Sequence, residues 1–296
     1  MKFLAFFGHL NIDVTLSVPS LPSPGQATGV KALREKFAGT AGNFAYVANA
    51  LGLKFDLYSA VGEISHEKYI ANLKKVGINT EHVDIMKEEN GPICYLPSDG
   101  REQIAYMFQG PMNNWEASKH FEYGNYTFLN IGTGPVKEYM KILDREKKAK
   151  VVFDPGQEIW YTYNKESAEY MVNHSNMIIM NRKEFYHLLE LLNTDSAAVY
   201  KTVNNIIITE GEKGATLIEN GESTLMPGIK PDRIADTIGA GDSFRAGLFT
   251  ALSNGYTLKD SVSIGNITAS KAIENNINEF NLNFQDILKL FKTIKS

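Results

Sequence analysis

A glycine-rich run near the C-terminus combines a potential anion site with a carboxylate. The run Asp236–Asp242 reads DTIGAGD, and the residues that follow, 243–249, have helical character. A glycine-rich turn that opens a helix presents free backbone N–H groups and the positive end of the helix dipole, which together bind an anion such as phosphate. A carboxylate at Asp242 would repel that phosphate, so its presence suits a base that takes a proton from an attacking hydroxyl. The alternative is an aspartate that only caps a buried helix.

Two other common phosphate-binding motifs are missing from the sequence. No Gly-x-x-x-x-Gly-Lys-Ser/Thr is present, which excludes a P-loop. No Gly-x-Gly-x-x-Gly follows the first apolar run, which argues against a dinucleotide site there. We therefore expect phosphate chemistry that depends on the run 236–242.

The elements that must position this run follow from the alternation of short apolar runs with amphipathic stretches. That alternation is typical of a βαβ sheet. We expect helices at 42–51 and 67–76, and strands at 2–7, 55–60, 126–131, 151–153, 177–180 and 206–209. The last four are rich in apolar residues, as expected for central parallel strands buried on both faces.

Three of the expected strands end in polar clusters. These are Asp154-Pro155-Gly156-Gln157, Asn181-Arg182-Lys183-Glu184 and Thr209-Glu210-Gly211. Ligands of open α/β sheets bind beyond the carboxyl ends of the strands, so the three clusters should converge on one crevice.

Two segments interrupt the pattern and together predict a small β-sheet. Residues 93–96 and 103–108 flank a turn at 97–100, which indicates a hairpin, and residues 14–37 carry three prolines between extended stretches. We expect a lid formed by 13–37 and 89–112 over a core formed by 1–12, 38–88 and 113–296. The alternative is an irregular surface insertion.

The composition limits the partners and the compartment. The formal net charge is −4 and the pI about 5.9, which disfavours nucleic acid as a partner. The lone Cys94 excludes an internal disulfide and fits a reducing compartment. No apolar run approaches the ~20 residues that span a bilayer, so we expect a cytoplasmic protein without a membrane partner.

The motifs resemble those of the ribokinase-like carbohydrate kinases, also called the PfkB family. The run 236–242 resembles the C-terminal signature of that family, and Ala38–Asn43 resembles its N-terminal glycine-rich signature. Asn11-Ile12-Asp13, Asn181–Glu184 and Thr209–Gly214 occur in the family's order, so the resemblance covers nearly the whole chain. It implies a three-layer α/β/α domain with a mainly parallel central sheet and a small β-sheet lid.

The same resemblance implies roles for individual residues. Asp242 would be the catalytic base, with an anion hole formed by Gly239, Ala240 and Gly241. The substrate would be bound by Asn11, Asp13, Gly39, Gly42, Asn43 and Gln157. ATP would contact Asn181, Thr209, Gly211 and Gly214, and Glu184 with Asn181 would hold Mg²⁺ through water. The alternatives are a turn-capping Asp13, a helix-capping Asn43 and a solvated Glu184.

Two segments resemble archaeal nucleoside kinases within this family. They are Asp154–Gln157 and Gly241–Gly247, which includes Arg245 where bacterial ribokinases and fructokinases commonly have Asn. This resemblance implies phosphorylation of a nucleoside 5′-hydroxyl by ATP. The base could stack on aromatic side chains of the hairpin, or these could simply pack across the strands: Tyr95, Tyr106 and Phe108.

Other functions are kept as alternatives. One is a sugar or sugar-phosphate kinase of the ribokinase, fructokinase or phosphofructokinase type. A basic pocket near the acceptor would favour the sugar-phosphate version, and Lys31 and Arg34 are the nearby candidates. A non-catalytic sensor is disfavoured because Asp242 is intact. The segment Glu63–His66 departs from the family pattern, which leaves the local loop geometry open, and Glu274–Asn278 lacks the family's Gly-Ala element, which leaves potassium dependence open. The resemblance also suggests a homodimer formed through the lid.

Overall fold

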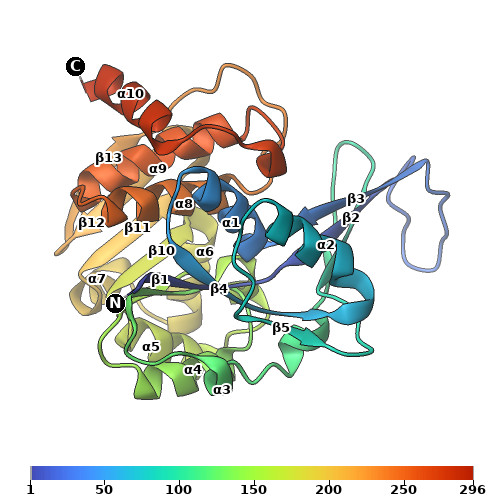
Figure 1. Ribbon diagram of the computed structural model, residues 1–296, viewed down its shortest axis with the longest axis horizontal. Helices are drawn as coiled ribbons and strands as arrows, with labels where there is room; N and C mark the ends of the chain where they lie inside the picture. Colours follow the sequence, from blue (N-terminus) through green and yellow to red (C-terminus); the bar gives the residue numbers. More distant parts are fainter. Residues whose placement is uncertain (1, 296) are drawn as a thin grey trace.

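A nine-stranded sheet forms the centre of the molecule in the computed structural model, which describes residues 2–295 (Figure 1). Its strand order is β13-β12-β11-β10-β9-β8-β1-β4-β5. The pairs β11–β12 and β12–β13 are antiparallel, and all other neighbouring strands are parallel. The strands are β1 (Lys2–Phe7), β4 (Phe55–Gly62), β5 (Val83–Met86), β8 (Tyr126–Ile131), β9 (Lys150–Phe153), β10 (Met177–Asn181), β11 (Asn205–Thr209), β12 (Gly214–Glu219) and β13 (Glu222–Pro227).

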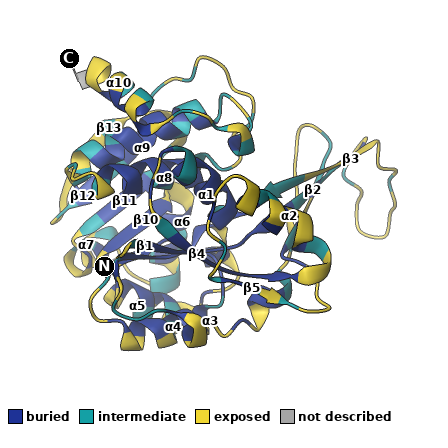
Figure 2. Cartoon of the chain, viewed as in Figure 1, coloured by how far each residue is buried: buried dark blue, intermediate teal, exposed yellow. Residues whose placement is uncertain are grey.

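Helices cover both faces of this sheet, which makes three layers (Figure 1). One face packs against α1 (Thr40–Ala50), α2 (Glu63–Lys75), α8 (Ala240–Ser253), α9 (Leu258–Ala272) and α10 (Phe284–Lys295). The other face packs against α3 (Ala117–His120), α4 (Val136–Arg145), α5 (Lys165–Asn173), α6 (Arg182–Leu192) and α7 (Ser196–Thr202). The central strands are buried on both faces, which explains their continuous apolar sequence (Figure 2).

The expected strands and helices of the core are all present, with small differences at their ends. Helix α2 begins at Glu63, four residues before the predicted start, so the segment Glu63–His66 is the first turn of a helix. The edge strands β5 and β13, and β12 beside β13, were not predicted. No helix within residues 2–295 has both the length and the apolar content needed to cross a bilayer.

A separate four-stranded sheet stands beside the core, in the order β3-β2-β6-β7 (Figure 1). Its strands are β2 (Asn11–Ser17), β3 (Ala32–Ala38), β6 (Ile93–Ser98) and β7 (Tyr106–Phe108). We call this sheet the lid sheet. The predicted hairpin is present, although its second strand is shorter than expected and Gln103 joins it only through a single bridge to Ser98. The ends of β2 and β3 project from the core and are mostly exposed (Figure 2).

Candidate active site

A cavity of about 450 Å³ lies between the lid sheet and the carboxyl ends of the central strands. The three polar clusters that follow β9, β10 and β11 all contribute to its wall, as the sequence predicted. Eleven of the predicted site residues line it: Asn11, Asp13, Gly39, Asn43, Gln157, Asn181, Thr209, Glu184, Gly239, Gly241 and Asp242. The topology therefore brings together motifs that are up to 231 positions apart in the sequence, since the first is Asn11 and the last is Asp242.

The glycine-rich run opens helix α8, as expected. Gly239 has a left-handed backbone with φ of 79°, and a Cβ atom there would lie 2.3 Å from the Ile277 side chain. Only glycine fits this turn without strain. Asp242 follows in the first turn of the helix and is 8% exposed. Its Oδ2 accepts a hydrogen bond of 2.9 Å from Asn43 Nδ2, which joins the N-terminal and C-terminal motifs directly.

Asp242 has the properties required of a base near neutral pH. Burial raises its pKa to about 6, and the nearby Glu184 adds to that rise. The guanidinium of Arg245 and the amide of Asn43 oppose the rise because both favour the ionised carboxylate. A pKa in this range keeps the carboxylate mostly ionised at pH 7 while leaving it basic enough to accept a proton.

Asp13 lies on β2, inside the lid sheet, and faces Lys36 across the β2–β3 pair. Burial raises its pKa to about 7, Lys36 opposes the rise, and the charges of Asp242 and Asp236 add to it. Asn11, two residues earlier on the same side of the strand, is 6% exposed, and its Oδ1 has no hydrogen-bond partner among the described residues. Asp13 is therefore a strand residue rather than the cap of a turn.

Asn181 and Glu184 cap helix α6 reciprocally. Asn181 Oδ1 accepts a hydrogen bond of 2.9 Å from the Glu184 N–H, and Glu184 Oε2 accepts one of 2.8 Å from the Asn181 N–H. Glu184 is 7% exposed, so the alternative of a solvated charge is wrong. Burial raises its pKa, which the hydrogen bond from Asn181 and the charge of Arg245 oppose. This geometry leaves one carboxylate oxygen of Glu184 for a hydrated metal.

Four predicted residues do not reach the cavity wall: Gly42, Ala240, Gly211 and Gly214. A Cβ atom at Gly42 would lie 1.9 Å from Tyr69 Oη, so this glycine makes room for the hydrogen bond of 2.7 Å from Tyr69 to the Ala38 carbonyl. Gly214 begins β12 with φ of 97°, and a Cβ atom there would lie 2.2 Å from the Met226 carbonyl oxygen. Gly42 thus allows helix α1 to pack closely against Tyr69, and Gly214 allows β12 to begin against the end of β13.

The lid sheet presents a different face to the cavity than the aromatic pattern suggested. Side chains that line the cavity alternate along the hairpin: Cys94, Leu96, Gln103, Ala105 and Met107. Tyr95, Tyr106 and Phe108 occupy the intervening positions and are 41%, 59% and 48% exposed. Tyr95 pairs with Tyr106 across the strands. Of the two alternatives for these aromatic residues, the geometry favours packing across the strands over stacking on a base, because successive strand residues point to opposite faces.

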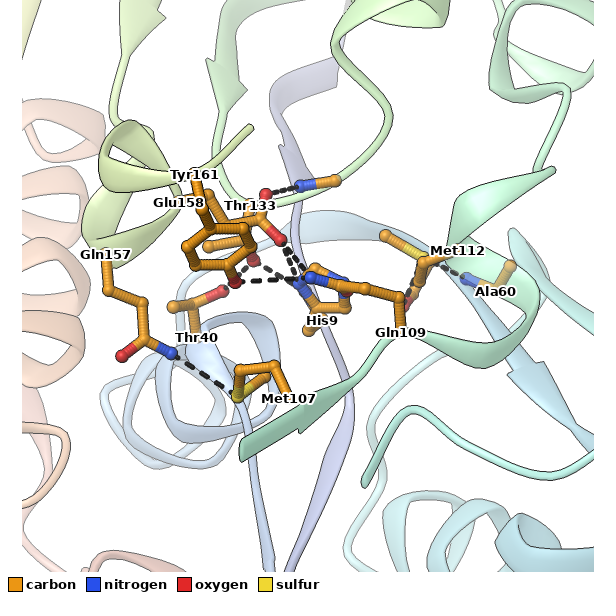
Figure 3. A network of polar contacts seen from close by, with 12 residues as sticks. His9, Thr40, Ala60, Met107, Gln109, Met112, Thr133, Gln157, Glu158 and Tyr161 are labelled. Atoms are coloured by element: carbon orange, nitrogen blue, oxygen red, sulfur yellow. Dashed lines mark hydrogen bonds and ion pairs between the residues drawn. The ribbon is translucent and has the colours of Figure 1, made fainter. Parts of the chain in front are cut away.

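A polar network, not predicted from the sequence, adds His9, Glu158 and Tyr161 to the wall (Figure 3). Gln109 Nε2 donates to Glu158 Oε1 at 2.8 Å and to Tyr161 Oη at 3.2 Å. His9 Nδ1 lies 3.6 Å from the same oxygen of Glu158, and its Nε2 has no hydrogen-bond partner within the described residues. Burial lowers the pKa of His9, and the charge of Glu158 opposes that effect.

This network comes from strand ends that carried no motif. His9 follows β1, and its backbone N–H donates to Thr133 Oγ1, beyond β8, at 3.1 Å. Glu158 lies in the 3₁₀ helix η2 (Gly156–Trp160), one residue after the polar cluster 154–157. The rule that ligands bind beyond strand ends could have found these residues if it had been applied to β1 and β8 as well.

Arg245 also belongs to the site, although its place there was not predicted. It lies one turn after Asp242 on α8 and lines the cavity. Its Nε and Nη2 both contact the Asp154 carboxylate, and its Nη1 lies 3.6 Å from Asp242 Oδ1. Burial raises the pKa of Asp154 to about 7, and the paired guanidinium opposes that rise.

Comparison with known proteins agrees with this geometry. The family model described as pfkB family carbohydrate kinase matches residues 1–277. A nucleoside kinase of Thermoplasma acidophilum is 42% identical over 97% of this chain and 95% of its own length. The nucleoside kinase of Methanocaldococcus jannaschii is 30% identical over 93% of this chain and 91% of its own length.

Solved structures show the same fold over the full length. The crystal structure of the Methanocaldococcus jannaschii nucleoside kinase matches with a TM-score of 0.87 at 28% identity and covers 99% of each chain. A Burkholderia thailandensis nucleoside kinase in complex with inosine matches with a TM-score of 0.89 at 20% identity, covering 98% of this chain and 96% of its own. The chain therefore belongs to the pfkB family of carbohydrate kinases.

Proposed function

We propose that the protein transfers the γ-phosphoryl group of ATP to the 5′-hydroxyl of a ribonucleoside, giving the nucleoside monophosphate and ADP. The observation that carries this proposal is the buried Asp242, held by Asn43 at the start of α8, in one cavity with the half-buried Asp13. Nucleoside kinases at 42% and 30% identity over nearly the whole chain favour a nucleoside as the acceptor.

The reaction follows from the position of Asp242. Its carboxylate accepts the proton of the acceptor hydroxyl as the oxygen attacks the γ-phosphorus, and the bond from that phosphorus to the bridging oxygen of ADP breaks. Charge that develops on the transferred group faces the N–H groups of Gly239 and Gly241, at the positive end of helix α8, whereas the N–H of Ala240 donates to the Thr237 carbonyl. ATP extends from there toward Asn181 and Thr209.

The ribose binds between β2 and α1. The Asp13 carboxylate accepts hydrogen bonds from both hydroxyls of the 2′,3′-diol, and the unpartnered Oδ1 of Asn11 is available as a further acceptor. Asn43 is fixed on Asp242 and holds the acceptor against the base. The remaining wall, which includes Gln157 and the network around His9, is left for the nucleobase (Figure 3).

Mg²⁺ fits beside Asn181 and Glu184 only through its bound water. Asn181 Oδ1 and Glu184 Oε2 already accept hydrogen bonds from backbone N–H groups, which leaves Oε1 of Glu184 to order a hydrated cation. When bound, Mg²⁺ neutralises charge on the ATP phosphates. A monovalent cation is not part of this proposal.

A sugar kinase is the second candidate, since ribokinases share this fold. The sugar-phosphate version is disfavoured because Lys31 and Arg34 are exposed and do not line the cavity. The charge of Arg245 is balanced by Asp154. A sensor without catalysis would have no use for a buried base with a raised pKa.

The test is a coupled assay of ADP formation with ATP and a panel of acceptors: five ribonucleosides, ribose, fructose and fructose 6-phosphate. A kcat/KM for a ribonucleoside at least tenfold above that for every sugar supports the proposal. A higher value for ribose or fructose replaces it with the sugar-kinase candidate.

Two further properties belong to this proposal. The outer face of the lid sheet exposes Leu33, Tyr95, Tyr106 and Phe108, an apolar surface suited to a second copy of the chain. A Tyr106→Glu variant should then lower the molar mass measured by light scattering.

The second property is the location. ATP as the donor and Cys94 as a free, buried thiol both fit a protein of the cytoplasm.

A further inference from the structure

Arg245 occupies an unusual place for a charged side chain. Its guanidinium is 11% exposed and lies among three buried carboxylates, Asp154, Asp242 and Glu184. Burying an arginine is costly unless its donors are paired. Nη2 meets that need by donating to Asp154 Oδ1, and Nε lies in ion-pair contact with Oδ2 of the same carboxylate. The third nitrogen, Nη1, is not used by this pair.

Nη1 lies beside the anion hole. It is 3.6 Å from Asp242 Oδ1, which is longer than a hydrogen bond. It is also so close to Gly241 that a Cβ atom at that position would lie 2.8 Å from it. The absence of a side chain at Gly241 therefore lets the guanidinium approach the backbone turn that binds phosphate.

We infer that Arg245 donates a hydrogen bond from Nη1 to the transferred phosphoryl group, and that Asp154 is a positioning residue that holds the guanidinium for this task. The inference rests on the proposed phosphoryl transfer. Arg245 stays protonated throughout, since its role is to stabilise charge on the equatorial oxygens while Asp242 takes the proton.

The shape of the side chain supports this division of labour. A planar guanidinium can present one edge to a carboxylate and still direct another nitrogen elsewhere, whereas a lysine ammonium is a single point charge. If Arg245 served only to pair with Asp154, it would not need to line the cavity or to lie beside the proposed catalytic carboxylate. Arg245 does line the cavity, and its Nη1 lies 3.6 Å from Asp242 Oδ1.

The test uses variants that separate charge stabilisation from folding. Arg245→Lys keeps the charge but not the fork, and the double variant Arg245→Gln/Asp154→Asn removes both members of the buried pair so that no lone charge is left behind. Arg145→Gln is the matched control, because Arg145 is an exposed residue of α4 and does not line the cavity. Each variant is checked for folding by its melting temperature and for ATP binding by calorimetry.

We expect kcat to fall about 10²–10³-fold in both Arg245 variants, while KM for the acceptor and Kd for ATP change less than about fivefold, because the contact forms in the transition state. Asp154→Asn alone should give a smaller loss of kcat. A folded double variant with kcat within about threefold of wild type overturns the inference. So does a loss confined to KM.

This outcome is distinguishable from failure of the proposed function. If the acceptor panel shows that a sugar is preferred, the same variants are compared with that sugar. Phosphoryl transfer and its dependence on Arg245 are then measured directly, whichever acceptor the enzyme uses.

Discussion

The most demanding prediction concerns the diol of the acceptor. If Asp13 accepts hydrogen bonds from both ribose hydroxyls, a 2′-deoxynucleoside leaves a buried carboxylate with one donor fewer. Asp13 is desolvated enough to raise its pKa to about 7, so water replaces the missing donor poorly. A missing partner of a buried charged group costs about 1–3 kcal/mol, which corresponds to about 5–150-fold in kcat/KM.

The assay is a four-way comparison of kcat/KM, with wild type and Asp13→Ala each tested on a ribonucleoside and its 2′-deoxy analogue. We expect the wild type to prefer the ribonucleoside by about tenfold or more, and the variant to lose most of that preference. Asp144→Ala, which changes an exposed aspartate on α4, should leave the preference intact. Equal rates of wild type on both sugars would refute the diol contact.

The raised pKa adds a pH dependence whose sign is fixed. Only the ionised carboxylate accepts from both hydroxyls without giving up an oxygen to its own proton. Because the pKa of Asp13 is about 7, the fraction ionised rises between pH 6 and pH 8. The ratio of kcat/KM for the ribonucleoside to that for its deoxy analogue should therefore increase over this range. A flat ratio would contradict the assigned contact.

Two predictions address the chemical step and the metal. Asp242→Asn should lower kcat by about 10²–10⁴ with substrate affinities nearly unchanged, and wild-type kcat should fall as the pH drops through about 6, where the base becomes protonated; near-normal turnover of the variant would remove Asp242 from that role. Glu184→Gln should raise the Mg²⁺ concentration needed for half-maximal rate, because an amide oxygen orders metal-bound water less strongly than a carboxylate. An unchanged Mg²⁺ dependence would show that Glu184 serves only as the cap of α6.

The centre of the fold could be predicted from the sequence because its signal is local. Strands buried on both faces must be apolar throughout, so runs such as 177–180 stand out from their polar surroundings. The edge strands lack that signal. β13 (Glu222–Pro227) alternates between exposed and half-buried positions, and β5 has four residues, so neither differs from a loop in composition.

The site could be predicted only where one short motif carries both shape and chemistry. DTIGAGD does so, because its glycines and its carboxylate act within a single helical turn. The contacts of Arg245 with Asp154 and of His9 with Glu158 join residues 91 and 149 positions apart, and they exist only because the strand order brings those strand ends together. The role of the aromatic residues in the lid could not be decided from the sequence for a related reason. Which face of the sheet a side chain occupies depends on whether its position along the strand is odd or even, and not on its residue type.

A final prediction follows from the cost of keeping the half-buried Asp13 desolvated. Its pKa is about 7 in the folded protein and 3.8 in the unfolded chain, so the folded state binds more protons between these values. The free energy of unfolding should therefore decrease as the pH rises from about 4 to 7. Asp13→Asn removes this titration while keeping the size of the side chain.

We expect that variant to be more stable than wild type at pH 8 by about 1–4 kcal/mol, and the gain to shrink at pH 5, where the folded carboxyl is protonated. Urea unfolding at the two pH values measures both quantities. A variant no more stable at pH 8, or one whose gain is the same at pH 5, would show that Lys36 already compensates the charge. A gain in stability with a loss of the ribose preference would mean that the carboxylate is kept for the acceptor at the expense of the fold, as expected for a binding residue and not for a structural one.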